Sequence, residues 1–217
     1  MKQQKNTFYL IAGPIAAGKS TFMENKLYNK ELTNVNLFDH DREKWMIDFY
    51  APDFKNSIGE FAISKAFENS INDSLRNHKD YVMQVHFTNK QLTEINTYFH
   101  KYGAKFNMEA HFISVNNLDI LKERARRRKK LGGHFSTEKN IESTYIQSFR
   151  NFIKYLPKLQ KATVWDNSKE YGFEDMEPQI VFERGVLVFS NQNMTDHAKD
   201  LLSKVIVSQK KSNGIGR

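Results

Sequence analysis

The sequence predicts an α/β fold in which helices cover both faces of a mainly parallel sheet of five core strands. Three observations favour this architecture. Apolar runs typical of buried strands alternate with segments of helical periodicity, a glycine-rich motif lies between the first strand and the first helix, and capping patterns, glycines or prolines mark helix ends. A length of 217 residues with 39% apolar residues suits one domain with a full core.

Five apolar runs are the expected core strands. They cover residues 7–11, 35–38, 81–85, about 108–115 and 162–165. Because helical patterns lie between these runs, we expect the strands to pair in parallel through helical crossovers.

Helical patterns occupy the intervals. The first helix is expected over residues 20–29, and Pro52 breaks the segment after the second strand. Two capping-box patterns open further helices: Ser57-x-x-Glu60 and Thr88-x-x-Gln91. A basic helix is expected to begin near Leu118, and Gly132-Gly133 ends it. The next helix has a regular apolar stripe: Ile141, Tyr145, Phe149, Phe152 and Leu156.

The chain beyond the fifth strand predicts an extension to the same domain. Residues 179–189 are typical of a β-hairpin or an extended edge that contains Gly185, and residues 195–204 of a helix. We therefore divide the single domain 1–217 into three parts. These are a core over residues 7–168, a C-terminal extension over residues 169–211 and a disordered tail over residues 212–217.

The glycine-rich motif carries the clearest functional prediction. It reads Gly13-Pro14-Ile15-Ala16-Ala17-Gly18-Lys19-Ser20 and lies between a strand and a helix, the context in which G-x-x-x-x-G-K-[ST] indicates a phosphate-binding loop. Its glycines let backbone N–H groups and a helix N-terminus point at one anion. Lys19 is expected to reach the β- and γ-phosphates of ATP, and Ser20 to bind Mg²⁺. Thr21, the next residue, is counted among the nucleotide-binding residues.

Two acidic residues leave the second strand directly after the phosphate-binding loop unit. They are Asp39 and Asp41. In open α/β sheets ligands bind beyond the carboxyl ends of the strands, so a carboxylate there could take a proton from an attacking hydroxyl or hold Mg²⁺. The alternative is an ordinary turn, because Asp also favours loop starts.

The formal net charge of +8 is concentrated in the basic helix. Its cluster contains Arg124, Arg126, Arg127, Arg128, Lys129 and Lys130. Arg124 and Arg128 are four residues apart, so they lie on one helical face, where their guanidinium groups could clamp phosphoryl oxygens. A solvated basic face explains the others. No aromatic residues interleave with the cluster, which disfavours nucleic acid as a partner.

Two further motifs follow strands or helices. Gly132-Gly133-His134 permits a mobile reversal of the kind a lid over ATP requires. Asp166-Asn167-Ser168 follows the fifth strand, where Asp166 and Asn167 are placed to meet a nucleotide base or ribose.

Composition excludes several classes of protein. The absence of Cys excludes disulfides and thiol chemistry, and the seven His include no pairs at metal-ligand spacing, which disfavours zinc. We expect no membrane span, because no apolar run is long enough, and no secretory leader. A cytoplasmic protein is therefore expected.

Together these landmarks resemble the zeta-toxin family of phosphate-loop kinases. The resemblance covers about residues 7–168 and rests on the order of the phosphate-binding loop, Asp39-His40-Asp41, Arg124-x-x-x-Arg128-x-x-x-Gly132-Gly133-His134 and Asp166-Asn167-Ser168. The arginine–glycine–histidine run is the most specific part. The resemblance implies a three-layer P-loop kinase fold.

The resemblance also implies an activity. It is the ATP-dependent phosphorylation of a small-molecule hydroxyl, in characterised members that of a UDP-N-acetyl amino sugar, by toxins with an antitoxin partner. By position, Asp41 matches the general base and Arg124 and Arg128 the lid helix. The acceptor is then expected to meet Asp39, Gln84, His86 and Thr88.

Two departures from the family concern transfer. The family usually has Glu and then Thr after the third strand, where this chain has Gln84-Val85-His86-Phe87. An amide can bind a hydroxyl but cannot take its proton. On the helix after Gly-Gly-His the family carries Arg, where this chain has Thr144 and Gln147; Arg150 is a possible replacement. The alternative function is therefore a degenerate nucleotide-binding protein with a regulatory role and little transfer. A binder of polynucleotides, supported by net charge alone, is the third.

Overall fold

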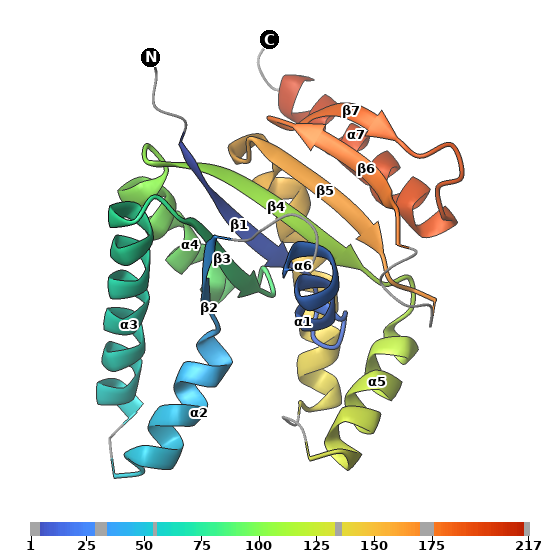
Figure 1. Ribbon diagram of the computed structural model, residues 1–217. Coiled ribbons are helices and arrows are strands. Elements are labelled where there is room, and N and C mark those ends of the chain that lie inside the picture. The colour runs from blue at the N-terminus through green and yellow to red at the C-terminus, as the bar shows by residue number, and fades with distance from the viewer. Residues whose placement is uncertain (1–4, 29–33, 54–55, 133–135, 170–175, 215–217) are drawn as a thin grey trace.

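The computed structural model describes residues 5–28, 34–53, 56–132, 136–169 and 176–214. Its centre is a seven-stranded sheet of order β2-β3-β1-β4-β5-β6-β7 (Figure 1). The strands are β1 (Asn6–Ala12), β2 (Val35–Phe38), β3 (Asp80–Val85), β4 (Phe106–Ser114), β5 (Lys161–Asp166), β6 (Pro178–Glu183) and β7 (Val186–Ser190). Strands β1 to β5 pair in parallel, and β6 and β7 pair antiparallel. The predicted parallel core and C-terminal hairpin are confirmed.

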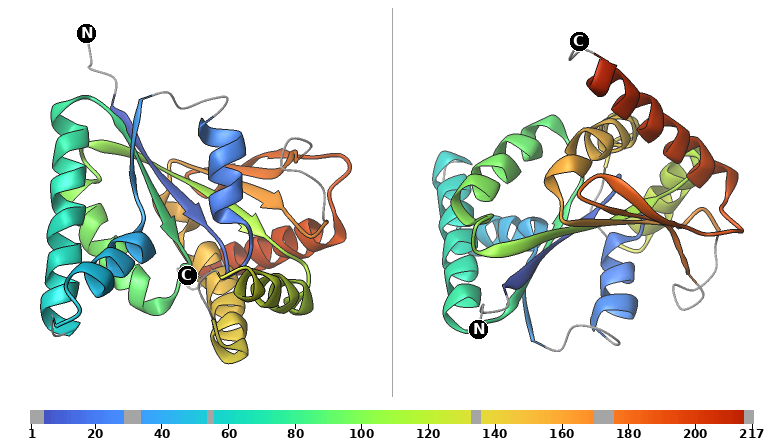
Figure 2. Two further views of the ribbon diagram at one scale, coloured as in Figure 1. Left: turned by 60° about the horizontal axis from the view of Figure 1, so that its bottom comes forward. Right: turned by 90° about the horizontal axis from the view of Figure 1, so that it is seen from above.

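Helices cover both faces of this sheet (Figure 2). The helical elements are α1 (Lys19–Phe22), the π-helical turn η1 (Met23–Tyr28), α2 (His40–Tyr50), α3 (Asn56–Arg76), α4 (Asn89–Tyr102), α5 (Leu118–Lys130), α6 (Glu138–Tyr155), the 3-10 turn η2 (Leu156–Lys158) and α7 (Asp196–Gly214). The larger core packs one face of the sheet against α3, α4, α6 and α7. The smaller core packs the other face against α1, η1 and α5. The predicted three layers are therefore present.

The strands serve both cores because their side chains alternate. Along β1, Phe8 and Leu10 belong to the larger core, whereas Ile11 belongs to the smaller one. A central parallel strand is buried on both faces, so its sequence is a continuous apolar run. This is why the core strands were recognisable.

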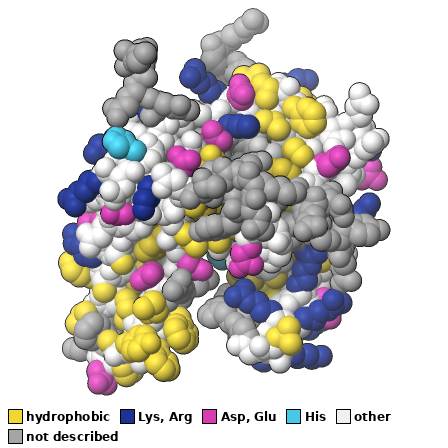
Figure 3. All heavy atoms as spheres, in the orientation of Figure 1, with side chains coloured by type: hydrophobic (Ala, Val, Ile, Leu, Met, Phe, Trp, Pro, Cys, Tyr) yellow, Lys and Arg dark blue, Asp and Glu magenta, His cyan; other side chains and the backbone are white. Residues whose placement is uncertain are grey.

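Helix α2 was not predicted. Its apolar side chains Trp45, Phe49 and Tyr50 are exposed rather than aligned on a buried stripe, so the sequence lacks the periodicity that marks a core-facing helix. Figure 3 shows hydrophobic side chains gathered over this part of the molecule, at its lower left.

One of the two capping boxes was wrong. Helix α3 already includes Asn56, so Ser57 lies inside its first turn and is not the N-cap. Thr88 does cap α4, because its hydroxyl accepts from the Gln91 amide at 3.4 Å. The Gln91 side chain, however, accepts from the His86 amide at 2.8 Å, which extends the contact to the loop before the helix.

Two helix lengths also differ from expectation. The α-helix after the glycine-rich motif ends at Phe22 and continues as a π-helical turn; Asn29, its expected end, lies outside the described residues. Helix α7 extends to Gly214, so it includes residues 212–214 of the tail expected to be disordered. Val205 packs in the core and the Gln209 side chain donates to the Gly185 carbonyl at 2.5 Å, which holds this later part of the helix on the hairpin. No helix in the described ranges is long and apolar enough to cross a membrane.

Candidate active site

A cavity of about 590 Å³ lies beyond the carboxyl ends of β1, β2 and β3. It is lined by Ile15, Ala16, Gly18, Lys19, Ser20, Thr21, Asp39, Gln84, His86, Gln91, Arg124, Arg128, Ser136 and Asn140. The structure thus brings together most of the residues that the sequence nominated from the glycine-rich motif, from the ends of two neighbouring strands and from the basic helix. This is the position at which open α/β sheets bind ligands.

The backbone of the motif requires its first glycine. Gly13 has φ +144°, and a Cβ there would lie 2.4 Å from the Ile113 carbonyl oxygen of β4. Gly18, in the left-handed region at φ 91°, starts α1. The first amides of a helix have no partner inside it, so they are available to an anion beside Lys19. The loop is therefore shaped as a phosphate cradle.

Two polar side chains fix this loop from outside the cavity. The buried Asn167 side chain donates to the Ala17 carbonyl at 2.8 Å. The Thr144 hydroxyl accepts from the Ile15 amide at 3.3 Å. The structure thus gives Asn167 a position behind the loop rather than in the cavity, where Gly13, Pro14 and Ala17 also do not appear among the lining residues.

The Lys19 ammonium is held by three acceptors at the base of the cavity. They are the carbonyl oxygens of Gly13 at 3.0 Å and Pro14 at 2.9 Å, and Nδ1 of His86 at 2.9 Å. His86 Nδ1 also lies 3.2 Å from the Gly13 carbonyl oxygen, but the ammonium is nearer and can only donate, so beside a charged Lys19 this nitrogen accepts. Burial, reinforced by the nearby positive charge of Lys19, lowers the pKa of His86 to about 3. His86 is therefore a neutral acceptor for the lysine.

The opposite side of the cavity is formed by neutral and acidic side chains. The Ser20 hydroxyl donates to Gln84 Oε1 at 3.1 Å, which links the loop to the end of β3. Asp39 lines the cavity at the end of β2. Asp41 lies in the first turn of α2, but its side chain is outside the described residues. Thr88 caps α4 and is not among the lining residues.

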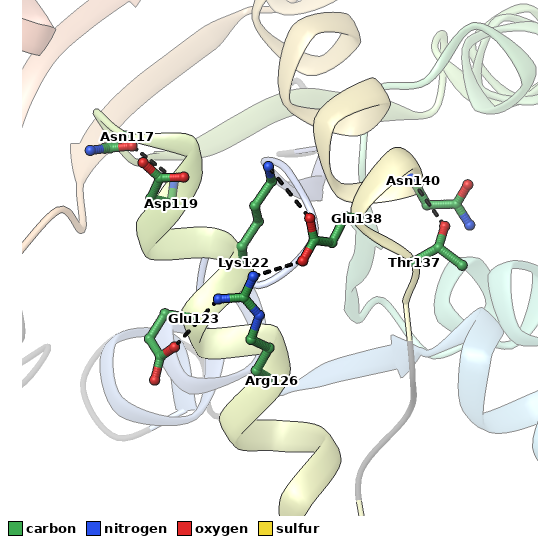
Figure 4. A network of polar contacts seen from close by, with 8 residues as sticks. All are labelled: Asn117, Asp119, Lys122, Glu123, Arg126, Thr137, Glu138 and Asn140. Carbon is green, nitrogen blue, oxygen red and sulfur yellow. Dashed lines mark hydrogen bonds and ion pairs between the residues drawn. The ribbon is translucent and has the colours of Figure 1, made fainter.

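Helix α5 contributes Arg124 and Arg128 to the cavity, as the four-residue spacing predicted. Arg124 also donates to the Lys169 carbonyl at 3.4 Å. Its neighbour Arg126 faces away, toward Glu138 in the first turn of α6, at 2.7 Å (Figure 4). Lys122 reaches the same carboxylate at 3.7 Å.

These ion pairs join α5, which precedes the Gly132-Gly133-His134 motif, to α6, which follows it. Gly132 has φ +79° with open space around its Cβ position. Gly133 and His134 lie outside the described residues.

Asp166 is not brought to the cavity. Its carboxylate accepts from the Ser168 amide at 2.9 Å and from the Thr195 hydroxyl. Thr195 in turn accepts from the Ala198 amide at 3.3 Å in the first turn of α7. Asp166 therefore joins the end of β5 to the start of α7, a position in the fold that the motif alone did not reveal.

Sequence analysis did not nominate two residues that line the cavity, Asn140 and Gln91. It named Thr144 only as a departure from the family, and the structure adds that Thr144 contacts the loop. Each is an ordinary polar residue near a helix start or on a helix face, so no pattern distinguishes it. Arg150 donates to Asn89 Oδ1 at 3.2 Å and does not line the cavity, so the structure does not place it where a missing lid arginine would act.

Among the described residues no group of three or more His, Cys, Asp or Glu side chains could hold a metal ion.

Comparison with known proteins shows the fold. No family model matches the sequence, and no curated protein matches it. A chain of the AvrRxo1-ORF1:AvrRxo1-ORF2 complex with sulphate ions gives a TM-score of 0.61 at 15% identity, over 93% of this chain and 63% of that one. A chain of the Pnkp1/Rnl/Hen1 RNA repair complex gives 0.58 at 19%, over 70% and 47%.

A third similar structure belongs to the PezAT chromosomal toxin–antitoxin system of Streptococcus pneumoniae, with a TM-score of 0.52 at 13% identity over 94% of this chain and 80% of that one. The present chain spans about half to two thirds of the length of the first two relatives. Together with the strand order and the loop, these similarities show a three-layer α/β fold in which a glycine-rich loop joins the first strand to the first helix.

Proposed function

We propose that the protein is an ATP-dependent phosphotransferase of zeta-toxin type, which transfers the γ-phosphate of Mg·ATP to a hydroxyl of a small molecule. The observation that supports this most is the convergence of three components in one cavity: the loop with Lys19, the acidic end of β2, and Arg124 and Arg128 of α5. Phosphoryl transfer needs a phosphate cradle, an acceptor site and cations facing the same space.

The cavity fits ATP and Mg²⁺ by its donor set. The similar AvrRxo1-ORF1:-ORF2 complex has been determined with ATP. Here the loop amides and Lys19 would hold the β- and γ-phosphates, and the Ser20 hydroxyl, together with Asp41, would hold Mg²⁺. Bound Mg²⁺ supplies neutralisation of the charge on the phosphate oxygens. Lys19 must then exchange at least one of its present acceptors for a phosphate oxygen.

In the proposed reaction Asp41 takes the proton of the acceptor hydroxyl. A bond forms between the acceptor oxygen and the γ-phosphorus, and the bond from that phosphorus to the β,γ-bridging oxygen breaks, which leaves ADP. Arg124 and Arg128 stabilise the charge on the transferred group. Asp41 is assigned by its place in the sequence, at the start of α2 beside Asp39.

We propose a UDP-N-acetyl amino sugar as acceptor. Besides the loop and the two arginines, the cavity is lined largely by neutral hydrogen-bonding groups: Gln84, Gln91, Ser136 and Asn140, with Asp39. Such groups suit the hydroxyl and amide groups of a sugar better than they suit an apolar acceptor. A protein partner of antitoxin type belongs to the same proposal, since two of the similar structures are of the AvrRxo1-ORF1:AvrRxo1-ORF2 complex and the PezAT toxin–antitoxin system.

A degenerate nucleotide-binding protein is the second candidate. Thr144 and Gln147 occupy the positions where the family carries Arg, and both make other contacts: Thr144 with the loop and Gln147 with the Asn89 amide at 2.9 Å. An arginine that contacts the transferred phosphate contributes ~10³-fold or more to rate. Its absence favours nucleotide binding without turnover.

The experiment that separates the two uses purified protein with Mg·ATP and a metabolite pool enriched in UDP-amino sugars, analysed by mass spectrometry. A phosphorylated UDP-sugar formed by the wild type and reduced at least ~10²-fold by Lys19→Ala would support the kinase. Lys65→Ala, an exposed change on α3, is the matched control. ATP binding without any phosphorylated product would support the degenerate protein instead.

A further inference from the structure

A second cavity, of about 680 Å³, lies between α6, the β6–β7 turn and α7. We call it the basic groove. It is lined by Arg150, Ile153, Lys154, Pro157, Arg184, Gly185, Val186, Lys204, Val205, Ser208 and Gln209. It shares no lining residue with the cavity at the phosphate-binding loop.

The groove combines several positive charges with no acidic lining residue. Asp200 neutralises Lys204 at 2.6 Å. Arg150 donates to the neutral Asn89 side chain. In the described part of the chain, no ion pair involves Arg150, Lys154 or Arg184. Arg150 and Lys154 are also four residues apart on α6, a spacing at which like charges repel.

One of these cations, Arg184, lies in the turn between β6 and β7 with a backbone conformation that residues other than glycine rarely adopt. Arg184 has φ 49° and Gly185 φ 79°, the pair of positive values typical of a type I′ hairpin turn. Gly185 is required, since a Cβ there would lie 3.2 Å from the Pro157 backbone. Gly, Asn or Asp is the usual residue where Arg184 stands. A residue held in an unfavourable backbone conformation at a cavity is an indication of function.

From this arrangement we infer that the basic groove binds a small anion with at least two negative charges. Arg150 and Arg184 would each offer two parallel N–H donors to a phosphate or carboxylate, and Lys154 a third charge. Ile153, Pro157 and Val186 give the groove an apolar floor. No aromatic side chain is among the lining residues, which disfavours a nucleobase stacked in the groove.

The contacts of Arg150 show a route by which such an anion would affect the first cavity. Asn89, which accepts from Arg150, also accepts from Asn151 at 3.0 Å. Asn151 donates to the Phe87 carbonyl at 2.6 Å, next to His86. An anion that draws Arg150 away from Asn89 would therefore act on the segment that carries the partner of Lys19.

The test is a titration of the full chain with pyrophosphate and, separately, citrate, followed by backbone amide NMR. The Gly185 and Gly18 amides report on the groove and on the phosphate-binding loop independently. We expect the Gly185 resonance to shift with a Kd below ~1 mM in dilute salt. The anion with the lower Kd identifies whether the groove prefers phosphate or carboxylate groups.

Arg184→Asn is the decisive variant, because Asn tolerates positive φ and removes the charge. We expect it to raise the melting temperature and to weaken anion binding at least tenfold. His78→Asn is the matched control, since His78 has the same φ of 49° outside the groove; it is expected to leave binding unchanged. Lys154→Gln should weaken binding several-fold, and Lys105→Gln, the same charge change elsewhere, should not.

Two results would overturn the inference. One is the absence of a Gly185 shift with either anion at ~10 mM, tenfold the upper limit of the expected Kd. The other is an affinity that falls equally in Lys105→Gln and Lys154→Gln. The second would mean attraction by net charge alone. Neither result depends on whether the protein is a kinase.

Discussion

The phosphate-binding loop is fixed by contacts from three other elements, whereas the acceptor side of the cavity depends on a few side chains at the ends of β2 and β3. On the loop side, β4 packs against Gly13, the residue after β5 holds Ala17, and α6 holds Ile15. On the acceptor side, the Gln84 side chain accepts from the Ser20 hydroxyl at 3.1 Å. Beyond it lies α2, with Trp45 and Phe49 exposed.

This difference indicates which side of the cavity can change in sequence without loss of the fold. Contacts with backbone atoms constrain the loop regardless of ligand, because a change there disturbs several elements at once. Half-exposed side chains on the acceptor side can be exchanged at little cost in stability. The departure from the zeta-toxin pattern at Gln84 lies on this second side, whereas His86, which contacts Lys19, lies between the two sides.

The largest expected effect comes from Gly13→Ala. The new Cβ would meet the Ile113 carbonyl at 2.4 Å, so the loop and β4 must move apart. We expect a loss of ~3 kcal/mol or more in the free energy of unfolding, with loss of nucleotide binding. Gly132→Ala is the control: its φ of +79° is also positive but its surroundings are open, so only ~1 kcal/mol of backbone strain is expected. Chemical denaturation measures both, and equal losses would contradict the role of β4.

Asn167→Ala should have the next largest effect. It removes the donor to the Ala17 carbonyl, and a buried carbonyl left without its partner costs ~1–3 kcal/mol. Nucleotide affinity should fall together with stability, since the same loop is loosened. Asn107→Ala removes an exposed amide with a 3.4 Å contact and is expected to cost ~0.5 kcal/mol or less. Unchanged stability in Asn167→Ala would show that the loop is fixed by its own backbone alone.

His86 lies between the two sides of the cavity, and its contribution to stability can be measured by varying the pH. Because the folded state lowers the pKa of His86 to about 3, the unfolded chain binds more protons below pH 6.5. The contribution of neutral His86 to the free energy of unfolding should therefore be fully present above pH 6.5. It should fall by ~1 kcal/mol per pH unit as the pH drops toward 3. His86→Gln should remove that share of the slope, measured by denaturation at several pH values. His111, whose pKa burial lowers to about 4, contributes a separate share that remains.

Gln84→Glu should change stability least, by less than ~0.5 kcal/mol. A carboxylate can still accept from Ser20, and it restores the group that the family carries. If the proposed transfer holds, KM for the acceptor changes while the affinity for ATP does not. A change in ATP affinity alone would place Gln84 with the phosphate side and remove the distinction between the two halves.

The sequence predicted the parts of the fold that burial dictates. The central strand β1 has apolar side chains in both cores, and the glycine-rich motif follows from a loop that must approach β4 closely, as Gly13 does. The spacing of Arg124 and Arg128 placed both on the face of α5 that meets the cavity. Burial and close approach of the backbone restrict the residue types at these positions, so the local sequence pattern reveals them.

Other features depend on contacts between distant segments. Helix α2 has no buried stripe, so its residues gave no periodic pattern. Asp166 was expected near a nucleotide because its motif follows a strand, but its carboxylate meets Thr195, 29 residues later. Likewise, the resemblance marked Thr144 as a position without the family's arginine, but no local pattern indicated that its hydroxyl contacts the Ile15 amide. Such residues can be assigned only once the chain is folded.

The contact between Asp166 and Thr195 has a practical consequence for anyone who wishes to shorten the protein. The kinase-like pattern ends at Ser168, which makes that residue an inviting place to stop a recombinant fragment. A fragment so cut would lose the hydroxyl that meets Asp166, the strand that pairs with β5, and the buried Ala198, Leu201 and Val205 that cover the sheet. Trimming from the C-terminus should therefore spare everything through α7, and deletion libraries should treat the last helix as part of the minimal folding unit.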